Sequence, residues 1–94
     1  MPTTHDPTAR RIAAMKGVPY NRGAGPDIIT PSEVIEVETI KTIGEARRQL
    51  RGYRCPVYVA GADKAATRVA LVYYRGTDIG VMDALGRILK PSTR

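Results

Sequence analysis

The stretch from Arg22 to Thr39 decides the fold, and it reads RGAGPDIITPSEVIEVET. A glycine-rich loop leads into a short apolar run, a Thr-Pro-Ser turn follows, and the next segment alternates apolar and acidic residues. Successive side chains of a β-strand point to opposite faces, so this segment predicts a strand with two different faces. One face carries Val34, Glu36 and Glu38, and the other carries Glu33, Ile35 and Val37.

Three acids converge if the two segments pair as a hairpin. Asp27 would then face Glu36 and Glu38 on the neighbouring strand. Like charges a few ångströms apart repel, so at least one acid must take a proton or share a cation. A Mg²⁺-type ion prefers oxygen ligands, usually carboxylates together with waters and a substrate phosphate. The spacing fits a hard-metal site, and it equally fits a strand with a solvated acidic face.

Length and composition predict one domain with a small core. The chain has 94 residues and a hydrophobic content of 43%. It has no Trp and no Phe, so Ile, Val, Leu, Ala and five Tyr must fill the core. A core of this size gives marginal stability, which favours an oligomer, and we expect a homodimer.

Cysteine and histidine usage argues against several kinds of site. Cys55 is the only cysteine, which excludes an internal disulfide and a cysteine-based zinc site and fits a reducing compartment. His5 is the only histidine, which argues against zinc chemistry and a Ser-His-Asp arrangement. No apolar run reaches membrane-spanning length and no signal peptide is visible, so we expect a soluble cytoplasmic protein with no membrane partner.

The basic charge favours a polyanionic partner. The net charge is +6, and eleven of the fifteen basic residues are arginine, the side chain suited to bidentate phosphate contact. The alternative is that this charge only keeps a small protein soluble. The candidate phosphate-binding residues are Arg10, Arg11, Arg22, Arg47, Arg48 and Arg51.

Periodicity and turn residues predict the remaining elements. One helix is expected over 7–16 with Asp6 as N-cap, and a second over 43–53 with Thr42 as cap. Residues 64–74 match a strand as well as a helix, and we expect the helix because Gly76 closes it. Strands are expected at 28–29, 33–39, 56–60, 79–82 and 87–89, with an extended piece at 18–20 and loose tails at 1–5 and 91–94.

The expected order is α-β-β-β-α-β-α-β-β, with two or three strands after the first helix. A central mixed β-sheet flanked by helices on both faces, in one domain spanning residues 1–94, fits that order.

Three short motifs resemble a known family. They are Gly25-Pro26-Asp27-Ile28-Ile29, Glu36-Val37-Glu38 and, on the following helix, Gln49-Leu50-Arg51-Gly52-Tyr53. Together they resemble the PD-(D/E)XK nuclease superfamily over roughly residues 7–90, closest to archaeal Holliday-junction resolvases and small RecB-like nucleases. The resemblance implies a restriction-endonuclease-like fold and an endonuclease that cuts duplex or branched DNA. It also implies Mg²⁺ or Mn²⁺ as the cofactor, with no small-molecule cofactor.

The same resemblance implies roles for individual residues. Asp27, Glu36 and the carbonyl of Val37 would be metal ligands. Glu38 occupies the position where most members place lysine, and it would act as general base or second-metal ligand. Lys41 could supply a displaced amine.

Further along the chain, Gln49 would orient the site. The first helix carries no acid after Asp6, whereas many resolvases have a glutamate there. The missing lysine also supports an alternative function, a catalytically inactive nucleic-acid-binding protein on the same fold.

Overall fold

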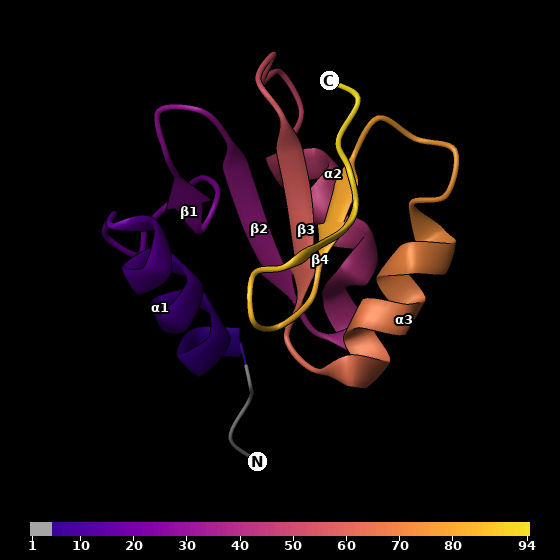
Figure 1. Cartoon of the computed structure of the whole chain (residues 1–94), viewed down its shortest axis with the longest axis horizontal. Helices are drawn as coiled ribbons and strands as arrows, with labels where there is room; N and C mark the ends of the chain where they lie inside the picture. The colour runs from indigo at the N-terminus through magenta and orange to yellow at the C-terminus, as the bar shows by residue number, and fades with distance from the viewer. Residues whose placement is uncertain (1–4) are drawn as a thin grey trace.

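The computed structural model describes residues 5–94, which form an α/β domain with a mixed five-stranded sheet (Figure 1). Its helices are α1 (His5–Lys16), the 3₁₀ helix η1 (Ile40–Glu45), α2 (Ala46–Gln49) and α3 (Lys64–Tyr73). Its strands are β1 (Ile28–Ile29), β2 (Val34–Glu38), β3 (Val57–Gly61), β4 (Gly80–Met82) and β5 (Ile88–Lys90).

The strands lie in the sheet in their order along the chain, β1-β2-β3-β4-β5. The central pairs β2–β3 and β3–β4 are parallel, and the outer pairs β1–β2 and β4–β5 are antiparallel. Every residue of β2 and β3 is buried, as expected for central strands that are covered on both faces. The mixed sheet predicted from the sequence is confirmed.

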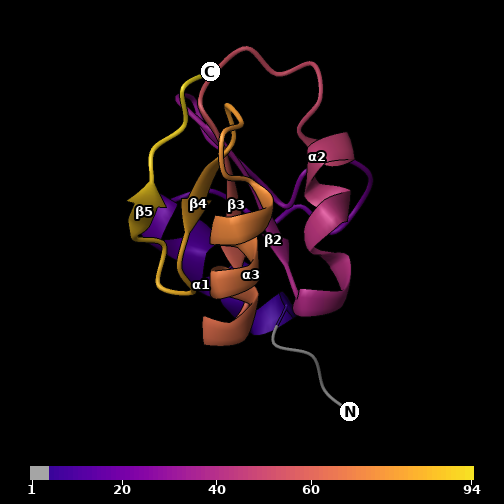
Figure 2. The same ribbon diagram turned by 90° about the vertical axis from the view of Figure 1, so that its right-hand side faces the viewer.

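Helices cover both faces of this sheet. Figure 1 shows α1 on one side and α3 on the other, and Figure 2 shows α2 and α3 side by side. Two separate groups of buried side chains follow from this layering. Ile35 and Val37 of β2 pack with α1, whereas Val34 of the same strand packs with η1, α2 and α3. The alternation predicted for this strand is therefore confirmed.

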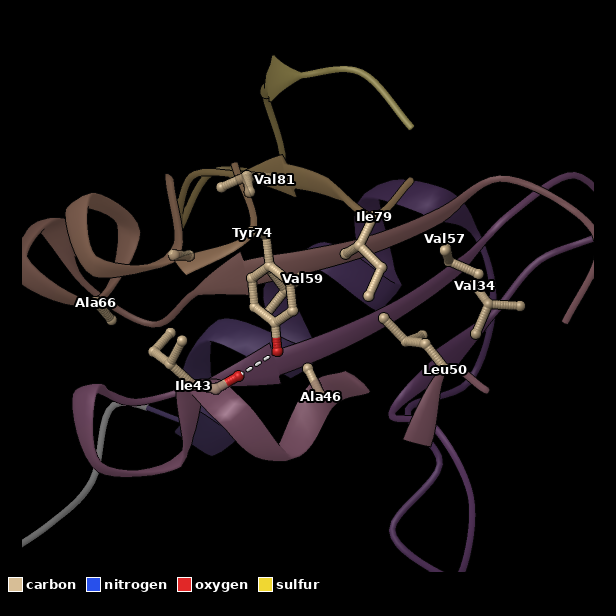
Figure 3. Close-up of a cluster of buried hydrophobic side chains, with 11 residues drawn as sticks. Val34, Ile43, Ala46, Leu50, Val57, Val59, Ala66, Tyr74, Ile79 and Val81 are labelled. Atoms are coloured by element: carbon tan, nitrogen blue, oxygen red, sulfur yellow. Dashed lines mark hydrogen bonds between the residues drawn. The ribbon is translucent and has the colours of Figure 1, made fainter. Parts of the chain in front are cut away.

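The core beneath α2 and α3 is aliphatic with one buried tyrosine (Figure 3). Tyr74 is fully buried, and its hydroxyl donates a hydrogen bond to the Ile43 carbonyl at 2.5 Å. This contact ties the end of α3 to η1. It also gives the buried Tyr74 hydroxyl a hydrogen-bond acceptor in an apolar region.

Helix α3 forms where the sequence was ambiguous between helix and strand. Its N-cap Asp63 accepts a hydrogen bond from the Ala66 N–H at 2.8 Å, which satisfies one of the free donors of the first turn. Ala66 and Ala70 are fully buried against the sheet. The predicted helix over 64–74 is confirmed as Lys64–Tyr73.

Two expected elements differ from the structure. Residues 18–20 form no strand, so two strands rather than three precede the second helix. The helix expected over 43–53 begins as the 3₁₀ helix η1 and continues as α2, which ends at Gln49. It ends before the expected position because Gly52 has a φ of +89°, outside the helical range. Thr42 is not its N-cap: the Thr39 N–H donates to Thr42 Oγ1 at 3.0 Å, so the cap lies three residues earlier.

The ends of the described chain are held in place rather than loose. His5 begins α1, so Asp6 lies in the first turn instead of capping the helix, and residues 1–4 of the expected tail lie outside the described residues. At the other end, the Arg94 guanidinium donates to the carbonyls of Leu50 and Tyr53 and pairs with Asp78. In the part of the chain that the structure describes, no helix is long and apolar enough to cross a membrane.

Candidate functional site

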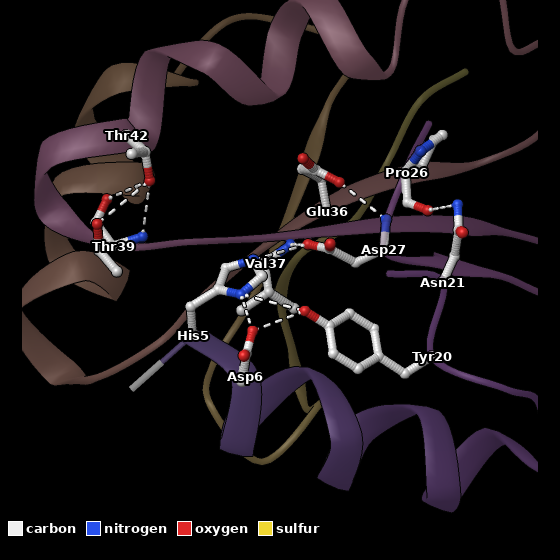
Figure 4. Close-up of polar contacts among 10 residues, drawn as sticks. All are labelled: His5, Asp6, Tyr20, Asn21, Pro26, Asp27, Glu36, Val37, Thr39 and Thr42. Atoms are coloured by element: carbon white, nitrogen blue, oxygen red, sulfur yellow. Dashed lines mark hydrogen bonds and ion pairs between the residues drawn. The ribbon is translucent and has the colours of Figure 1, made fainter. Parts of the chain in front are cut away.

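The pairing of β1 with β2 brings Asp27 to Glu36. Ile28 pairs with Ile35 in the antiparallel ladder, and Asp27 and Glu36 are the next residues outward. The Asp27 N–H donates to Glu36 Oε1 at 2.9 Å, and the Val37 N–H donates to Asp27 Oδ2 at 2.9 Å (Figure 4). At the end of the ladder, each carboxylate thus accepts a backbone N–H hydrogen bond in place of a backbone carbonyl. These two bonds hold the acids side by side.

His5, which was expected to lie in a loose tail, completes this cluster. His5 Nε2 lies 3.1 Å from Asp27 Oδ2, and His5 Nδ1 lies 3.0 Å from Asp6 Oδ1. The Tyr20 hydroxyl donates to the same Asp6 oxygen at 2.8 Å. The contact between His5 and Asp27 spans 22 positions, so no local pattern around His5 could predict it.

The three predicted acids are buried. The exposed fractions of Asp27, Glu36 and Glu38 are 9%, 8% and 5%. Glutamates are almost never this buried without a partner that offsets the loss of hydration. The strand therefore does not carry a solvated acidic face, which was the alternative interpretation of the sequence.

Burial and mutual repulsion shift the titration of these acids. Burial raises the pKa of Glu36 to about 8, and the charge of Asp27 adds to the shift. Burial also raises the pKa of Glu38 to about 7, with a further rise from the charge of Asp27, while a hydrogen bond to Thr42 and, less strongly, the charge of His5 oppose it. At neutral pH the two glutamates are thus divided between protonated and ionised forms.

The histidine and tyrosine of the cluster are also perturbed. Burial lowers the pKa of His5, but the hydrogen bond to Asp6 and the charge of Asp27 outweigh it, so the pKa is raised overall. Burial raises the pKa of Tyr20 to about 12, with a further contribution from its hydrogen bond to Asp6. A protonated His5 donates from both ring nitrogens, which matches its two carboxylate neighbours.

The other predicted site residues lie around this cluster. Val37 provides the N–H that binds Asp27, and Glu38 shares the α2 side of the sheet with Glu36. Lys41 is exposed on η1, and Gln49 is half-buried at the end of α2. No role for Lys41 or Gln49 follows from a contact in the structure.

The candidate arginines do not form one surface. All six are exposed: Arg10, Arg11, Arg22, Arg47, Arg48 and Arg51. Arg10 and Arg11 belong to α1, whereas Arg47 and Arg48 belong to α2 on the opposite face of the sheet. A phosphate backbone contacting both sets would have to pass around an edge of the sheet.

Among residues 5–94, no group of three or more His, Cys, Asp or Glu side chains is arranged to hold a metal ion. The structure brings two carboxylates together, and Mg²⁺ commonly uses one or two protein carboxylates and takes its remaining oxygen ligands from water and phosphate. The oxygen donors of Asp27 and Glu36 thus suit a hard cation in chemical type. Burial, with the charge of Asp27, raises the pKa of Glu36 and so disfavours its ionised form.

Comparison of the chain with protein-family models, with curated proteins and with solved structures finds no match.

Proposed function

We propose that this protein is a divalent-metal-dependent endonuclease that hydrolyses phosphodiester bonds in DNA, on a restriction-endonuclease-like variant of the α/β fold. The observation that carries the proposal is a pair of hydrogen bonds at the end of the β1–β2 ladder: the Asp27 N–H donates to the Glu36 carboxylate, and the Val37 N–H donates to the Asp27 carboxylate. Both acids are buried. A cytoplasmic location and a homodimer belong to the same proposal.

A divalent cation would resolve the electrostatic conflict of this pair. Ionising Glu36 beside Asp27 is unfavourable at neutral pH, because burial and the charge of Asp27 raise the pKa of Glu36 to about 8. A bound cation stabilises the ionised form of both acids, so ion binding is coupled to loss of the Glu36 proton. Asp27 and Glu36 would hold the ion, with the Val37 carbonyl as a third oxygen.

When bound, such an ion supplies Lewis acidity toward a phosphate oxygen and lowers the pKa of a bound water. The protein's own residues have separate tasks in this proposal. Glu38 accepts a proton from the attacking water, and its pKa of about 7 suits a general base at neutral pH. His5 holds the Asp27 carboxylate in position, and Asp6 and Tyr20 hold His5.

DNA is the proposed substrate because the surface is strongly basic while the buried cluster is acidic. The net charge of +6 attracts a polyanion, and counterion release makes such binding fall steeply with salt. The second candidate function is a nucleic-acid-binding protein without catalysis. It is favoured by Glu38 in the position where the resembling nucleases place lysine.

Nicking of supercoiled or branched DNA separates these two functions. Wild-type protein with Mg²⁺ or Mn²⁺ should nick the DNA, and chelator should abolish the nicking. The Asp27→Asn variant should lose activity by about a thousandfold or more, given that ligand loss removes the ion's contribution to the barrier. Glu45→Gln, which removes an acid 58% exposed on η1, is the matched control and should retain activity. DNA binding without metal-dependent nicking in wild-type protein would favour the second candidate.

A further inference from the structure

Helix α3 carries an apolar hollow on its outer surface. Arg68, Val69, Val72 and Tyr73 line this hollow, whose volume is about 350 Å³. Val72 is 65% exposed and Tyr73 is 48% exposed, so the hollow opens to solvent. The hollow is shallow and open, so it suits the flat face of a ligand rather than enclosing one.

Positive charge surrounds the hollow. The Arg47 guanidinium lies 5.7 Å from the centroid of the Tyr73 ring, within the range of a cation–π contact. Arg68 lies on the rim, and α3 carries Lys64 and Arg68 but no acidic residue. Helices α2 and α3 lie side by side in Figure 2, so arginine and aromatic side chains share one surface.

We propose that this hollow binds an unpaired nucleobase, and that Arg47 and Arg68 contact the phosphates on either side of it. A base needs an apolar or aromatic surface for its face and cations for its backbone, which are the two features combined here. The site is thus a docking point for single-stranded nucleic acid. This inference rests on the proposed function and refines it, because the substrate would then be DNA with an unpaired strand.

Charge decides between this occupant and a second copy of the chain. A symmetric contact between two α3 helices would place Arg68 and Lys64 of one copy near the same residues of the other. The acids on the adjoining segments are already engaged, because Asp63 caps α3 and Glu45 pairs with Arg48. Nucleic acid supplies the opposite charge instead. The hollow also belongs to the α2–α3 layer, which covers the face of the sheet carrying Glu36 and Glu38.

Binding of oligonucleotides is measured in the presence of a chelator, so that metal-dependent cleavage does not affect the result. Labelled oligo-dT, oligo-rU and a duplex of equal length are titrated at low salt, and a 2-aminopurine placed in a single strand reports stacking. Single strands should bind at least tenfold more tightly than the duplex, and the 2-aminopurine fluorescence should fall on binding. The preferred single strand identifies the polymer as DNA or RNA.

Matched variants assign the binding to the hollow. Val72→Glu should weaken single-strand binding about tenfold more than Leu89→Glu, which makes the same charge change at a residue 49% exposed on β5. Val72→Lys should not weaken it. Tyr73→Phe should bind within about twofold of wild type, because it keeps the aromatic ring. Tyr73→Leu removes the ring and should lose about tenfold in affinity.

Equal effects of Val72→Glu and Leu89→Glu, or unchanged 2-aminopurine fluorescence, would overturn the inference. So would a dimer in solution that Val72→Glu dissociates while single-strand binding stays intact, because the hollow would then be an interface between copies. Intact single-strand binding without any metal-dependent nicking would reject the nuclease proposal and leave this inference standing.

Discussion

The backbone N–H of Asp27 donates to the Glu36 carboxylate at 2.9 Å, while the Asp27 carboxylate accepts the N–H of the residue that follows Glu36. The two acids are thus held by the ends of two antiparallel strands rather than by flexible loops. Their proximity is unfavourable when both are ionised, and it is maintained by the hydrophobic packing of Ile28 and Ile35 next to them, both fully buried. Under the proposed function, this fixed arrangement would hold the two carboxylates in position for a cation.

Stability of the metal-free protein should fall as the pH rises from about 5 to 8. Glu36 and Glu38 have folded-state pKa values of about 8 and about 7, above their ordinary value of 4.5, so the folded state binds more protons than the unfolded state in this window. The raised pKa of His5 acts in the same direction, since its contribution is lost as the pH passes its folded-state value. Thermal unfolding at several pH values measures the effect.

The Glu36→Gln variant is the control for this pH dependence. This variant removes the group whose pKa is raised the most, so its melting temperature should change less between pH 5 and pH 8 than that of wild type. A wild-type protein whose melting temperature rises through this window would contradict the assigned shifts.

Replacement of His5 by alanine should move the pH dependence of cleavage to higher pH. The positive charge of His5 lowers the pKa of Glu38, so removing it raises the pH at which Glu38 becomes a base. The acid limb of the pH–activity profile should move to higher pH, and the cleavage rate at neutral pH should fall several-fold. Tyr20→Phe leaves His5 and both of its carboxylate neighbours in place and should shift the limb less. An unshifted limb in His5→Ala would exclude the effect of the His5 charge on Glu38.

The buried hydroxyl of Tyr74 should contribute measurably to stability. Tyr74→Phe removes this buried hydrogen bond to the Ile43 carbonyl, which should cost about 0.5–1.5 kcal/mol in the free energy of unfolding. Tyr73→Phe makes the same chemical change on the exposed neighbour and should stay within about 0.5 kcal/mol of wild type. Equal effects in urea unfolding would show that the Tyr74 contact does not stabilise the fold.

Close packing of β3 against α3 should make Gly61 intolerant of a side chain. A Cβ at this position would lie 2.3 Å from Thr67 Oγ1 and 2.4 Å from the Thr67 backbone nitrogen. Gly61→Ala should therefore destabilise the protein by about 1–3 kcal/mol through overpacking. Gly23→Ala places its Cβ 3.6 Å from the nearest atom, Asn21 Oδ1, which is an ordinary contact distance. This variant should have the same midpoint of denaturant unfolding as wild type.

Local patterns were sufficient for the sheet and for part of the site. The alternation from Val34 to Glu38 predicts which side chains face α1 and which face α2, because a period of two leaves only one arrangement when both faces are covered. The turn between β1 and β2 then places Asp27 opposite Glu36. Gly76 favours a helix over 64–74, and the structure has a helix at Lys64–Tyr73 with Asp63 as its N-cap.

Contacts between distant parts of the chain were beyond these patterns. His5 was placed in a loose tail because Asp6-Pro7 is a typical helix start, whereas the helix begins at His5 itself and points it at Asp27. Arg94 reaches Leu50 across 44 positions, and nothing near the end of the sequence indicates that contact. The exact depth of Glu36 and Glu38 was also unpredictable, since it depends on the helices that cover them.

The central claim is that Asp27 and Glu36 form a site that a divalent cation occupies, and titration of Glu36 measures it most directly. Carbon-detected NMR of the side-chain carboxyl gives the pKa of Glu36 with and without Mg²⁺. The Mg²⁺ concentration is about 10 mM, roughly tenfold above the weakest dissociation constants of protein calcium sites. We predict a pKa of about 8 without the ion and a clear fall when it is added. A pKa that Mg²⁺ and the diamagnetic Ca²⁺ both leave unchanged would contradict the metal site.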